Sequence, residues 1–308
     1  MPKVNPSPSP LPLPKKRVSK FGNIINEIFD YDRGLAAEKA MRKFMSPPRV
    51  LPGRRERAIL QSATVTEFQV NGLSLKRYVW QNRAGPSPYV MLGHGFMIST
   101  ASMLNFVRPL LRAGFSVVAW DQPAHGQSEG DLTYVQAWAD SFAINAQTYT
   151  PVAGVIGFSL SGTCALMSLV ENPSFNICPA LVCINSPRQI DTVLQGFMLK
   201  HGIPLSLMQQ MHEWAFSNRL RLPRMDQPFM EHCKGLSKTR CLFIQDHNDP
   251  VASEAEAKYW ASMVQHSTLK FTYKLKHQGA LSNDPLIEEV VKFIQGHSVS
   301  QANLRSSL

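Results

Sequence analysis

The stretch VAGVIGFSLSG at residues 152–162 joins a continuous apolar run to a cluster of glycine and serine residues. The apolar run, Val152–Ile156, is typical of a strand buried on both faces, and Thr163–Val170 beyond the cluster has the pattern of a helix. A serine at a sharp strand-to-helix turn is lifted clear of the sheet, and its neighbours must be small because the two backbones approach closely. We therefore predict that Ser159, in this G-x-S-x-G-like turn, is a nucleophile.

The turn departs from the usual pattern at one position. Gly157 supplies the first glycine, but Ser161 stands where the second is usual, and Gly162 follows it. Serine is small enough for that place. Two alternatives stay open: an ordinary Gly/Ser turn at the start of a helix, and Ser161 as the nucleophile. Ser161 fits the spacing poorly, because it lies two residues into the helix.

The chain on both sides of this turn alternates between strand and helix patterns. The β-rich runs Thr64–Val70 and Leu73–Trp80 are joined by Asn71-Gly72, a dipeptide that favours positive φ and marks a tight hairpin. The further candidates are strands Tyr89–Leu92, Ser116–Trp120, Ala180–Ile184, Cys241–Ile244 and Leu269–Leu275, and helices Ser99–Arg112 and Leu286–Ile294. Repeated β-α-β units of this kind predict the α/β class, with a mostly parallel, doubly wound sheet that opens with an antiparallel hairpin.

A serine nucleophile needs a base and an acid that orients the base, and both should lie on loops at the carboxyl ends of strands. Asp249 follows the strand 241–244 and precedes Pro250, which makes it our candidate acid. Asp246 is the rival, since it lies nearer the strand end. His277 follows the last strand, in a loop marked by glycine and alanine, and is our candidate base.

Such a site also needs two backbone N–H groups to hold the oxyanion that forms during acyl transfer. One should come from Leu160, directly after the nucleophile. The other should come from the loop after an early strand. That loop reads LGHGFM at residues 92–97, and we expect Phe96 to be the donor.

Five segments between about residues 60 and 296 together resemble the α/β-hydrolase superfamily, in its lysophospholipase and serine-aminopeptidase-like branch. They are the HGF oxyanion loop, the segment DQPAHGQS at 121–128, the elbow at Ser159, the acid loop DPV at 249–251 and the late histidine His277. The order serine, aspartate, histidine matches that superfamily. The resemblance implies an α/β-hydrolase fold and gives His125 a structural role. The chain departs from the pattern at residues 122–124, at Ser161, and at Asp246, where glycine is common.

The predicted reaction is two-step acyl transfer by Ser159, His277 and Asp249, with no metal or organic cofactor. Residues 187–235 lie between two sheet strands and read as a small helical cap. This segment holds several methionines and aromatic residues, Met225 and Met230 among them, which are typical either of ordinary packing or of an adaptable apolar wall. We expect carboxylic esters with an apolar acyl or alcohol part. The alternatives are thioesters, amide or C–C bond hydrolysis, and a catalytically silent binding protein.

The net charge of +10 lies mostly at the N-terminus, because residues 1–58 hold 13 Lys and Arg against 5 Asp and Glu. The rest of the chain is nearly neutral, so no nucleic-acid partner is expected. A weak contact of the extension with an anionic membrane is the open alternative. We expect three divisions: a basic, Pro-rich extension at 1–58, a hydrolase domain at 59–296 and a flexible tail at 297–308. Within the extension we expect a helix over 20–45, broken near Gly34, and a linker at 46–58.

The cysteines and apolar runs bear on the compartment. Five cysteines without paired spacing favour buried, reduced thiols over a disulfide framework. The apolar runs are too short to span a bilayer, and no secretory signal is convincing. We therefore expect a cytoplasmic protein, and the sequence leaves its oligomeric state open. Deleting residues 1–18 should leave ester turnover nearly intact.

Overall fold

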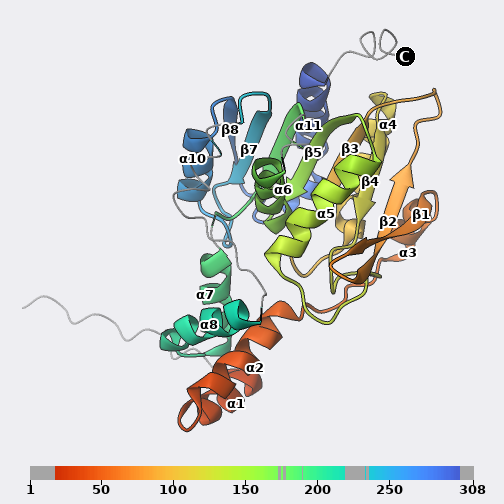
Figure 1. The fold of residues 1–308 in the computed structure, drawn as a ribbon. Helices are drawn as coiled ribbons and strands as arrows, with labels where there is room; N and C mark the ends of the chain where they lie inside the picture. Colours follow the sequence, from red (N-terminus) through yellow and green to blue (C-terminus); the bar gives the residue numbers. More distant parts are fainter. Residues whose placement is uncertain are drawn as a thin grey trace, which may run out of the picture.

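The described residues form one eight-stranded sheet with the order β1-β2-β4-β3-β5-β6-β7-β8 (Figure 1). The computed structural model describes residues 18–172, 175, 178–188, 190–218, 233 and 236–298. The strands are β1 (Thr64–Val70), β2 (Leu73–Trp80), β3 (Tyr89–Gly93), β4 (Ser116–Trp120), β5 (Val152–Phe158), β6 (Ala180–Ile184), β7 (Arg240–Asp246) and β8 (Ser267–Thr272). β2 pairs antiparallel with β1 and β4, and every other pair is parallel. The predicted α/β class is confirmed.

The hairpin at the start of the sheet is made as its sequence predicts. Asn71 and Gly72 have φ of 50° and 82°, so both central residues lie in the left-handed region that a tight two-residue turn requires. The turn pairs Val70 with Leu73, and the register continues to Thr64 opposite Val79. Asparagine and glycine tolerate this conformation best, which is why the dipeptide is informative.

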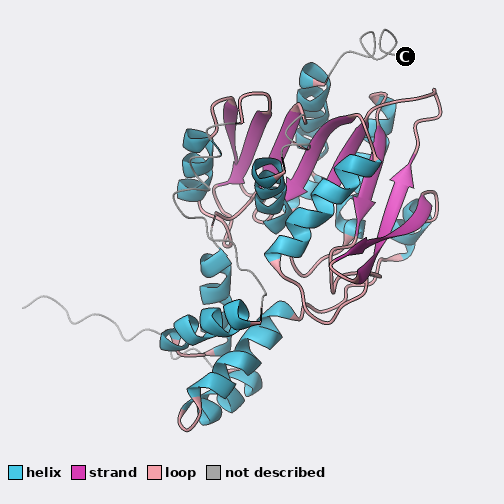
Figure 2. Cartoon of the chain, in the orientation of Figure 1, coloured by secondary structure: helices cyan, strands magenta, loops and turns pink. Residues whose placement is uncertain are grey.

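Helices cover both faces of the sheet (Figure 2). One buried cluster joins the sheet to α5 (Val135–Thr148), α6 (Leu160–Glu171) and α10 (Glu254–Met263). The cluster on the other face includes α3 (Arg54–Leu60), the 3-10 helices Thr100–Phe106 and Gly279–Ser282, α4 (Val107–Arg112) and α11 (Asp284–His297). Every residue of β4, β5 and β6 is buried, which explains why these strands are continuously apolar and do not alternate.

Two of the differences between the expected and the observed element limits have a clear local cause. The single helix expected over 99–112 is a 3-10 helix followed by α4. Pro109 explains the break, because proline is tolerated only in the first turn of an α-helix. The last strand ends at Thr272, three residues early, since Lys274 and Lys276 have φ of 63° and 57° and turn the chain into the loop that carries His277.

In the part of the chain that the structure describes, four helices form a lid that stands away from the sheet (Figure 1). We call α1 (Lys20–Phe29) and α2 (Arg33–Met45) the N-terminal arm, and α7 (Ile190–His201) and α8 (Met208–Ser217), joined through the 3-10 helix Leu205–Leu207, the cap helices. Arm and cap helices share one buried apolar cluster, separate from the two clusters on the sheet. The lid is therefore assembled from two distant segments of the chain.

The N-terminal helix breaks at residues 30–32, a few residues before the expected Gly34. Asp32 ends the break by capping α2, and its Oδ1 accepts a hydrogen bond of 2.9 Å from the N–H of Leu35. The segment 46–58, expected as a linker, contains the start of α3. Arg49 in this segment donates to the carbonyl oxygens of three residues of the 126–130 loop at 2.6–3.1 Å.

The arm is fastened to the end of α7. Ser19 Oγ lies 2.8 Å from His201 Nδ1, and Asn26 Nδ2 donates to the carbonyl oxygen of Gly202 at 3.1 Å. Close packing adds to these bonds, because a Cβ placed on Gly22 would lie 1.7 Å from the carbonyl oxygen of His201. Only glycine allows α1 to approach α7 this closely.

We expect Gly22→Ala to loosen the arm from the cap helices. The added methyl group overlaps backbone, which cannot move aside easily, so a cost of about 1–3 kcal/mol is expected. Hydrogen exchange in α1 and limited proteolysis after Phe29 should both become faster. Gly34→Ala is the matched control, because its Cβ would meet only a side-chain oxygen at 3.4 Å. Equal exchange in both variants would contradict the close contact.

All five cysteines are buried and none forms a disulfide, as expected from their spacing. Burial raises the pKa of each thiol, so they remain protonated and unreactive. Among the described residues no helix combines the length and apolarity needed to cross a membrane. Residues 1–17 of the Pro-rich extension, Met225, Met230 and residues 299–308 of the expected tail lie outside the described residues, and His297, expected to begin that tail, ends α11.

Candidate active site

Ser159 lies in the sharp turn between β5 and α6. Its φ of 51° and ψ of −125° are strained for a residue with a side chain, and its exposed fraction is 5%. The N–H of Ser159 donates to the carbonyl oxygen of Ile184 at 2.8 Å, which anchors the turn to β6. A Cβ on Gly157 would lie 2.6 Å from the Cα of Gly162, so strand and helix approach as closely as the sequence pattern requires.

His277 connects Ser159 to Asp249. Its Nε2 lies 3.0 Å from Ser159 Oγ, and its Nδ1 lies 2.7 Å from Asp249 Oδ2. The other carboxylate oxygen of Asp249 accepts the N–H of Val251 at 2.7 Å and of Ala252 at 3.2 Å. The Asp249 side chain is fully buried, so its oxygens are held by these partners. A carboxylate can only accept, so His277 Nδ1 carries the proton and Nε2 faces the serine hydroxyl.

Asp246 does not touch the imidazole of His277. Its oxygens accept hydrogen bonds from the N–H groups of Asn248, Leu275 and Lys276 and from the hydroxyl of Thr272, at 2.9–3.0 Å. Burial works to raise the pKa of this carboxyl, but the hydrogen bonds to its charged form outweigh burial and lower the pKa. Asp246 therefore holds the backbone directly before His277, while Asp249 meets the ring.

Asn185 is a residue that the sequence reasoning missed. It lies just past β6 with a φ of 48°, fully buried. Its Nδ2 donates to the carbonyl oxygens of Lys276 and His277 at 3.1 and 2.8 Å, and its Oδ1 accepts the N–H of Asp246. Asparagine after a strand end hints at positive φ, but no sequence signal shows that its partners lie 61 to 92 residues farther along the chain.

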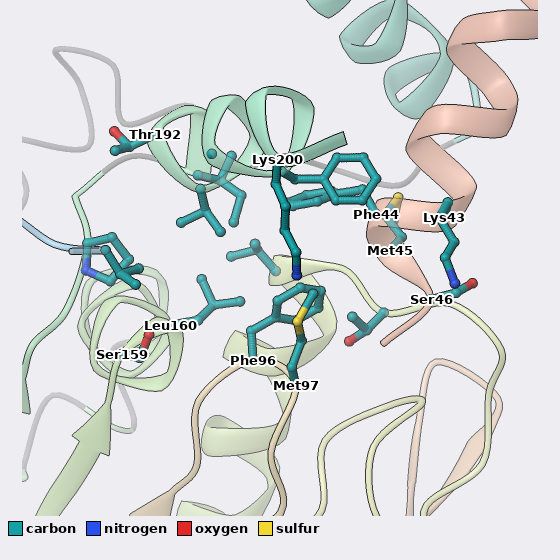
Figure 3. Close-up of a pocket in the computed structure, with 18 of the residues that line it drawn as sticks. Lys43, Phe44, Met45, Ser46, Phe96, Met97, Ser159, Leu160, Thr192 and Lys200 are labelled. Carbon is teal, nitrogen blue, oxygen red and sulfur yellow. The ribbon is translucent and has the colours of Figure 1, made fainter. Parts of the chain in front are cut away.

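Phe96 and Leu160 lie beside Ser159 in the same cavity (Figure 3). Leu160 begins α6, so its N–H has no partner within the helix. Within the described part of the chain, neither its N–H nor that of Phe96 donates to a protein acceptor. The N–H of the next residue, Met97, donates to His125 Nε2 at 3.2 Å. The N–H groups of Phe96 and Leu160 are therefore available to donate to a group bound beside Ser159.

Two buried histidines hold the loops around the site. His94 Nε2 accepts the N–H of Gln122 at 3.0 Å, and its Nδ1 donates to the carbonyl oxygen of Gly95 at 2.8 Å. His125 Nδ1 donates to the carbonyl oxygen of Pro123 at 2.9 Å. Burial lowers the pKa of His94 to about 4. Burial, together with repulsion from His94 when that ring is protonated, lowers the pKa of His125 to about 3. Both are neutral, and His125 has the structural contacts that the resemblance implies.

Ser161 makes no hydrogen bond to His277, whose Nε2 lies against Ser159 instead. Its hydroxyl donates to the carbonyl oxygen of His94 at 2.5 Å, and the residue is fully buried. Gly93 makes room for it, because a Cβ there would lie 2.7 Å from both the Cβ and the Oγ of Ser161. The serine that replaces the usual glycine thus ties the start of α6 to the loop before Phe96.

We expect the free energy of unfolding to fall as the pH is lowered from 7 to 5. The pKa of His94 is about 4 in the folded protein and about 6.5 when unfolded, so unfolding takes up a proton in this range. The neutral, buried His94 stabilises the folded protein fully above pH 6.5. By pH 5 this residue alone should lower the free energy of unfolding by about 2 kcal/mol. Urea denaturation at pH 7, 6 and 5 measures this. A pH-independent midpoint would contradict the neutral, buried histidine.

The cavity that contains Ser159 and His277 has a volume of about 400 Å³. Its wall is mostly apolar and comes from three parts of the chain. The sheet domain supplies Phe96 and Leu160, the cap helices supply Phe197, and the arm supplies Phe44 and Met45 (Figure 3). The ring centroid of Phe44 lies 5.7 Å from that of Phe96 and 5.4 Å from that of Phe197, so the arm closes one side of the cavity.

Comparison with known proteins points to one family. A sequence profile of the alpha/beta hydrolase family matches residues 89–287. The uncharacterized hydrolase YugF of Bacillus subtilis is 23% identical over 185 residues, which cover 54% of this chain and 67% of that protein. The Pyrococcus furiosus esterase Pf2001 has a TM-score of 0.61 at 20% identity, covering 82% of this chain and 97% of its own. Est1E of Butyrivibrio proteoclasticus, solved with ferulic acid bound, has a TM-score of 0.56 at 14% identity, covering 75% and 98%.

Proposed function

This chain belongs to the alpha/beta hydrolase family and is a hydrolase, and we propose that it is a serine esterase acting on carboxylic esters with an apolar acyl or alcohol part. One observation carries the proposal. Ser159 and His277 line an apolar cavity, and together with Asp249 they form a continuous hydrogen-bonded chain. The order and contacts are those that make a hydroxyl a nucleophile.

The proposed reaction has two acyl-transfer steps. Ser159 Oγ attacks the ester carbonyl carbon while His277 Nε2 takes its proton, and the carbonyl π electrons move onto the oxygen. The N–H groups of Phe96 and Leu160 hold this oxyanion. The oxyanion then collapses, the alkoxide leaves with the proton from Nε2, and an acyl-serine remains. Water, deprotonated by Nε2, attacks the acyl-serine, which releases the acid and restores Ser159.

Asp249 acts in both steps without touching the substrate. Its carboxylate fixes the Nδ1–H tautomer of His277 and stabilises the ring while it carries two protons. Its own position is fixed by the two backbone N–H groups of Val251 and Ala252. Asp246 and Asn185 hold the backbone of the His277 loop, so the base has the same position in each turnover.

The apolar wall supports an ester over a more polar substrate. A cavity of about 400 Å³ suits an acyl chain or small aromatic group, and Phe96, Phe197 and Met45 offer it apolar contact. Among the structurally similar proteins, Pf2001 is an esterase. Est1E was solved with ferulic acid, a carboxylic acid, bound. Thioesters fit the same cavity and mechanism and are the second candidate.

Turnover of a matched substrate panel tests the proposal. We expect p-nitrophenyl butyrate and hexanoate to be hydrolysed, with burst kinetics if deacylation is slow. The corresponding thioesters and p-nitroanilides, assayed in parallel, rank ester against thioester and amide. A fluorophosphonate should label the protein at Ser159, as peptide mass spectrometry would show. If neither turnover nor labelling is observed, a catalytically silent binding protein is the better explanation.

A further inference from the structure

The cavity carries positive charge at some distance from Ser159. Lys43 of the arm and Lys200 of the cap helices both line it, together with His201. In Figure 3 the Lys200 side chain runs from α7 toward Phe96 and Met97, and Lys43 lies across the cavity from Ser159. The two lysines therefore face the same apolar space as the proposed nucleophile.

No acidic side chain balances these lysines among the described residues. None of the described residues that line the cavity is an aspartate or a glutamate. In the same part of the chain, no carboxylate oxygen lies within 4 Å of the amine of Lys43 or Lys200. The cations act on their neighbours, because the pKa of His201 is lowered by burial and then by the charges of Lys200 and Lys43.

We infer that the substrate is an ester whose apolar body carries an anionic group, a carboxylate or a phosphate, held by Lys43 and Lys200. This inference rests on the proposed esterase function of the same cavity. The scissile carbonyl would lie at Ser159 and the apolar body along Phe96, with the anion between the arm and the cap helices. Such an anion gains charge-assisted hydrogen bonds that a neutral substrate cannot make.

The position of the lysines gives the arm a role in selecting the substrate. Lys43 lies in the last turn of α2 and Lys200 in the last turn of α7, so the anion would join the two halves of the lid. Helix ends of this polarity favour lysine even without a ligand. For that reason the test measures preference among ligands, and the stability of the variants serves only as a check on folding.

Three p-nitrophenyl esters of similar length test the preference: the hexanoate, the adipate monoester with a terminal carboxylate, and the 6-aminohexanoate. A fourth, with a terminal phosphonate, separates carboxylate from phosphate. We expect kcat/KM to be highest for an anionic ester and lowest for the cationic one. The preference should weaken with added salt, because the lysines are solvent-exposed.

Substitution of the lysines should remove the preference selectively. Lys43→Met and Lys200→Met remove the charge but keep an unbranched side chain that is one atom shorter. Each should reduce the ratio of kcat/KM for the anionic ester to that for the neutral ester about threefold to tenfold. Lys39→Met is the matched control, because this exposed lysine of α2 does not line the cavity, and it should leave the ratio unchanged. A ratio near one in the unmodified protein would overturn the inference.

A binding measurement keeps this inference separate from the esterase proposal. Octanoate, octyl phosphate and octylamine are titrated into Ser159→Ala by calorimetry, with and without both lysine substitutions. Binding of an anion that needs the lysines supports the inference even if no ester is turned over. Ester turnover without anion preference would overturn the inference and leave the esterase proposal intact, and so would anion binding that does not need the lysines.

Discussion

Ser159→Ala is expected to lower kcat for p-nitrophenyl butyrate by about 10⁴–10⁶-fold while the protein stays folded. The substitution removes only the hydroxyl oxygen that lies 3.0 Å from His277 Nε2. Alanine fits the same turn, and the backbone N–H groups of Phe96 and Leu160 remain. Any residual rate would come from substrate binding and these two donors. Steady-state kinetics and circular dichroism of the purified variant measure both parts of the expectation.

Ser161→Ala is the matched control for this experiment. It removes a hydroxyl two residues away, which donates to the carbonyl oxygen of His94 and does not meet His277. We expect at most about a tenfold loss, because only a positioning hydrogen bond is removed. Fluorophosphonate labelling that survives in Ser159→Ala and disappears in Ser161→Ala would reassign the nucleophile to Ser161.

Asp249→Asn is expected to lower kcat by about 10⁴-fold. The amide keeps the size of the carboxylate but loses its charge, and its NH₂ group can reverse the tautomer of His277, so Nε2 would no longer accept the serine proton. The loss should appear in kcat, since Asp249 does not line the cavity and its side chain is buried. The pH profile of kcat/KM, measured with the same ester, reports the changed state of the histidine.

Asp246→Asn separates the two candidate acids. This carboxylate accepts four hydrogen bonds from the chain around the His277 loop, and an amide can accept only at its one oxygen. We expect a loss of about 1–3 kcal/mol in stability and a much smaller loss of kcat than for Asp249→Asn. Full activity in Asp249→Asn with loss in Asp246→Asn would reverse the assignment of the acid.

The sequence was most informative where local chemistry decides local structure. Asn71 and Gly72 predict a tight hairpin because few other residues readily adopt their backbone conformation. Continuous apolar runs indicate buried parallel strands, and Gly157, two residues before Ser159, indicates a close approach of strand and helix. The α/β class followed from these features, because each depends only on residues that are neighbours in the chain.

The assembly of the lid could not be predicted from residues that are neighbours in the chain. The extension at residues 1–58 looked like an appendage with a linker, yet Phe44 and Met45 close the cavity beside the proposed nucleophile. Helical periodicity shows that a helix has an apolar face, but it does not show which surface that face will meet. The partner surface, including Phe197, lies some 150 residues farther along the chain.

The sequence by itself determined the strand-to-helix turn that presents Ser159, and the loops on which Asp249 and His277 lie. The tertiary structure alone decided that Asp249 meets the imidazole ring while Asp246, three residues earlier, holds the loop. It also brought Asn185 to that loop and Lys43 to the same cavity as Lys200. The physical reason is that turn and strand preferences act within a few residues. Hydrogen bonds between loops and packing between helices depend instead on distances that only the folded chain defines.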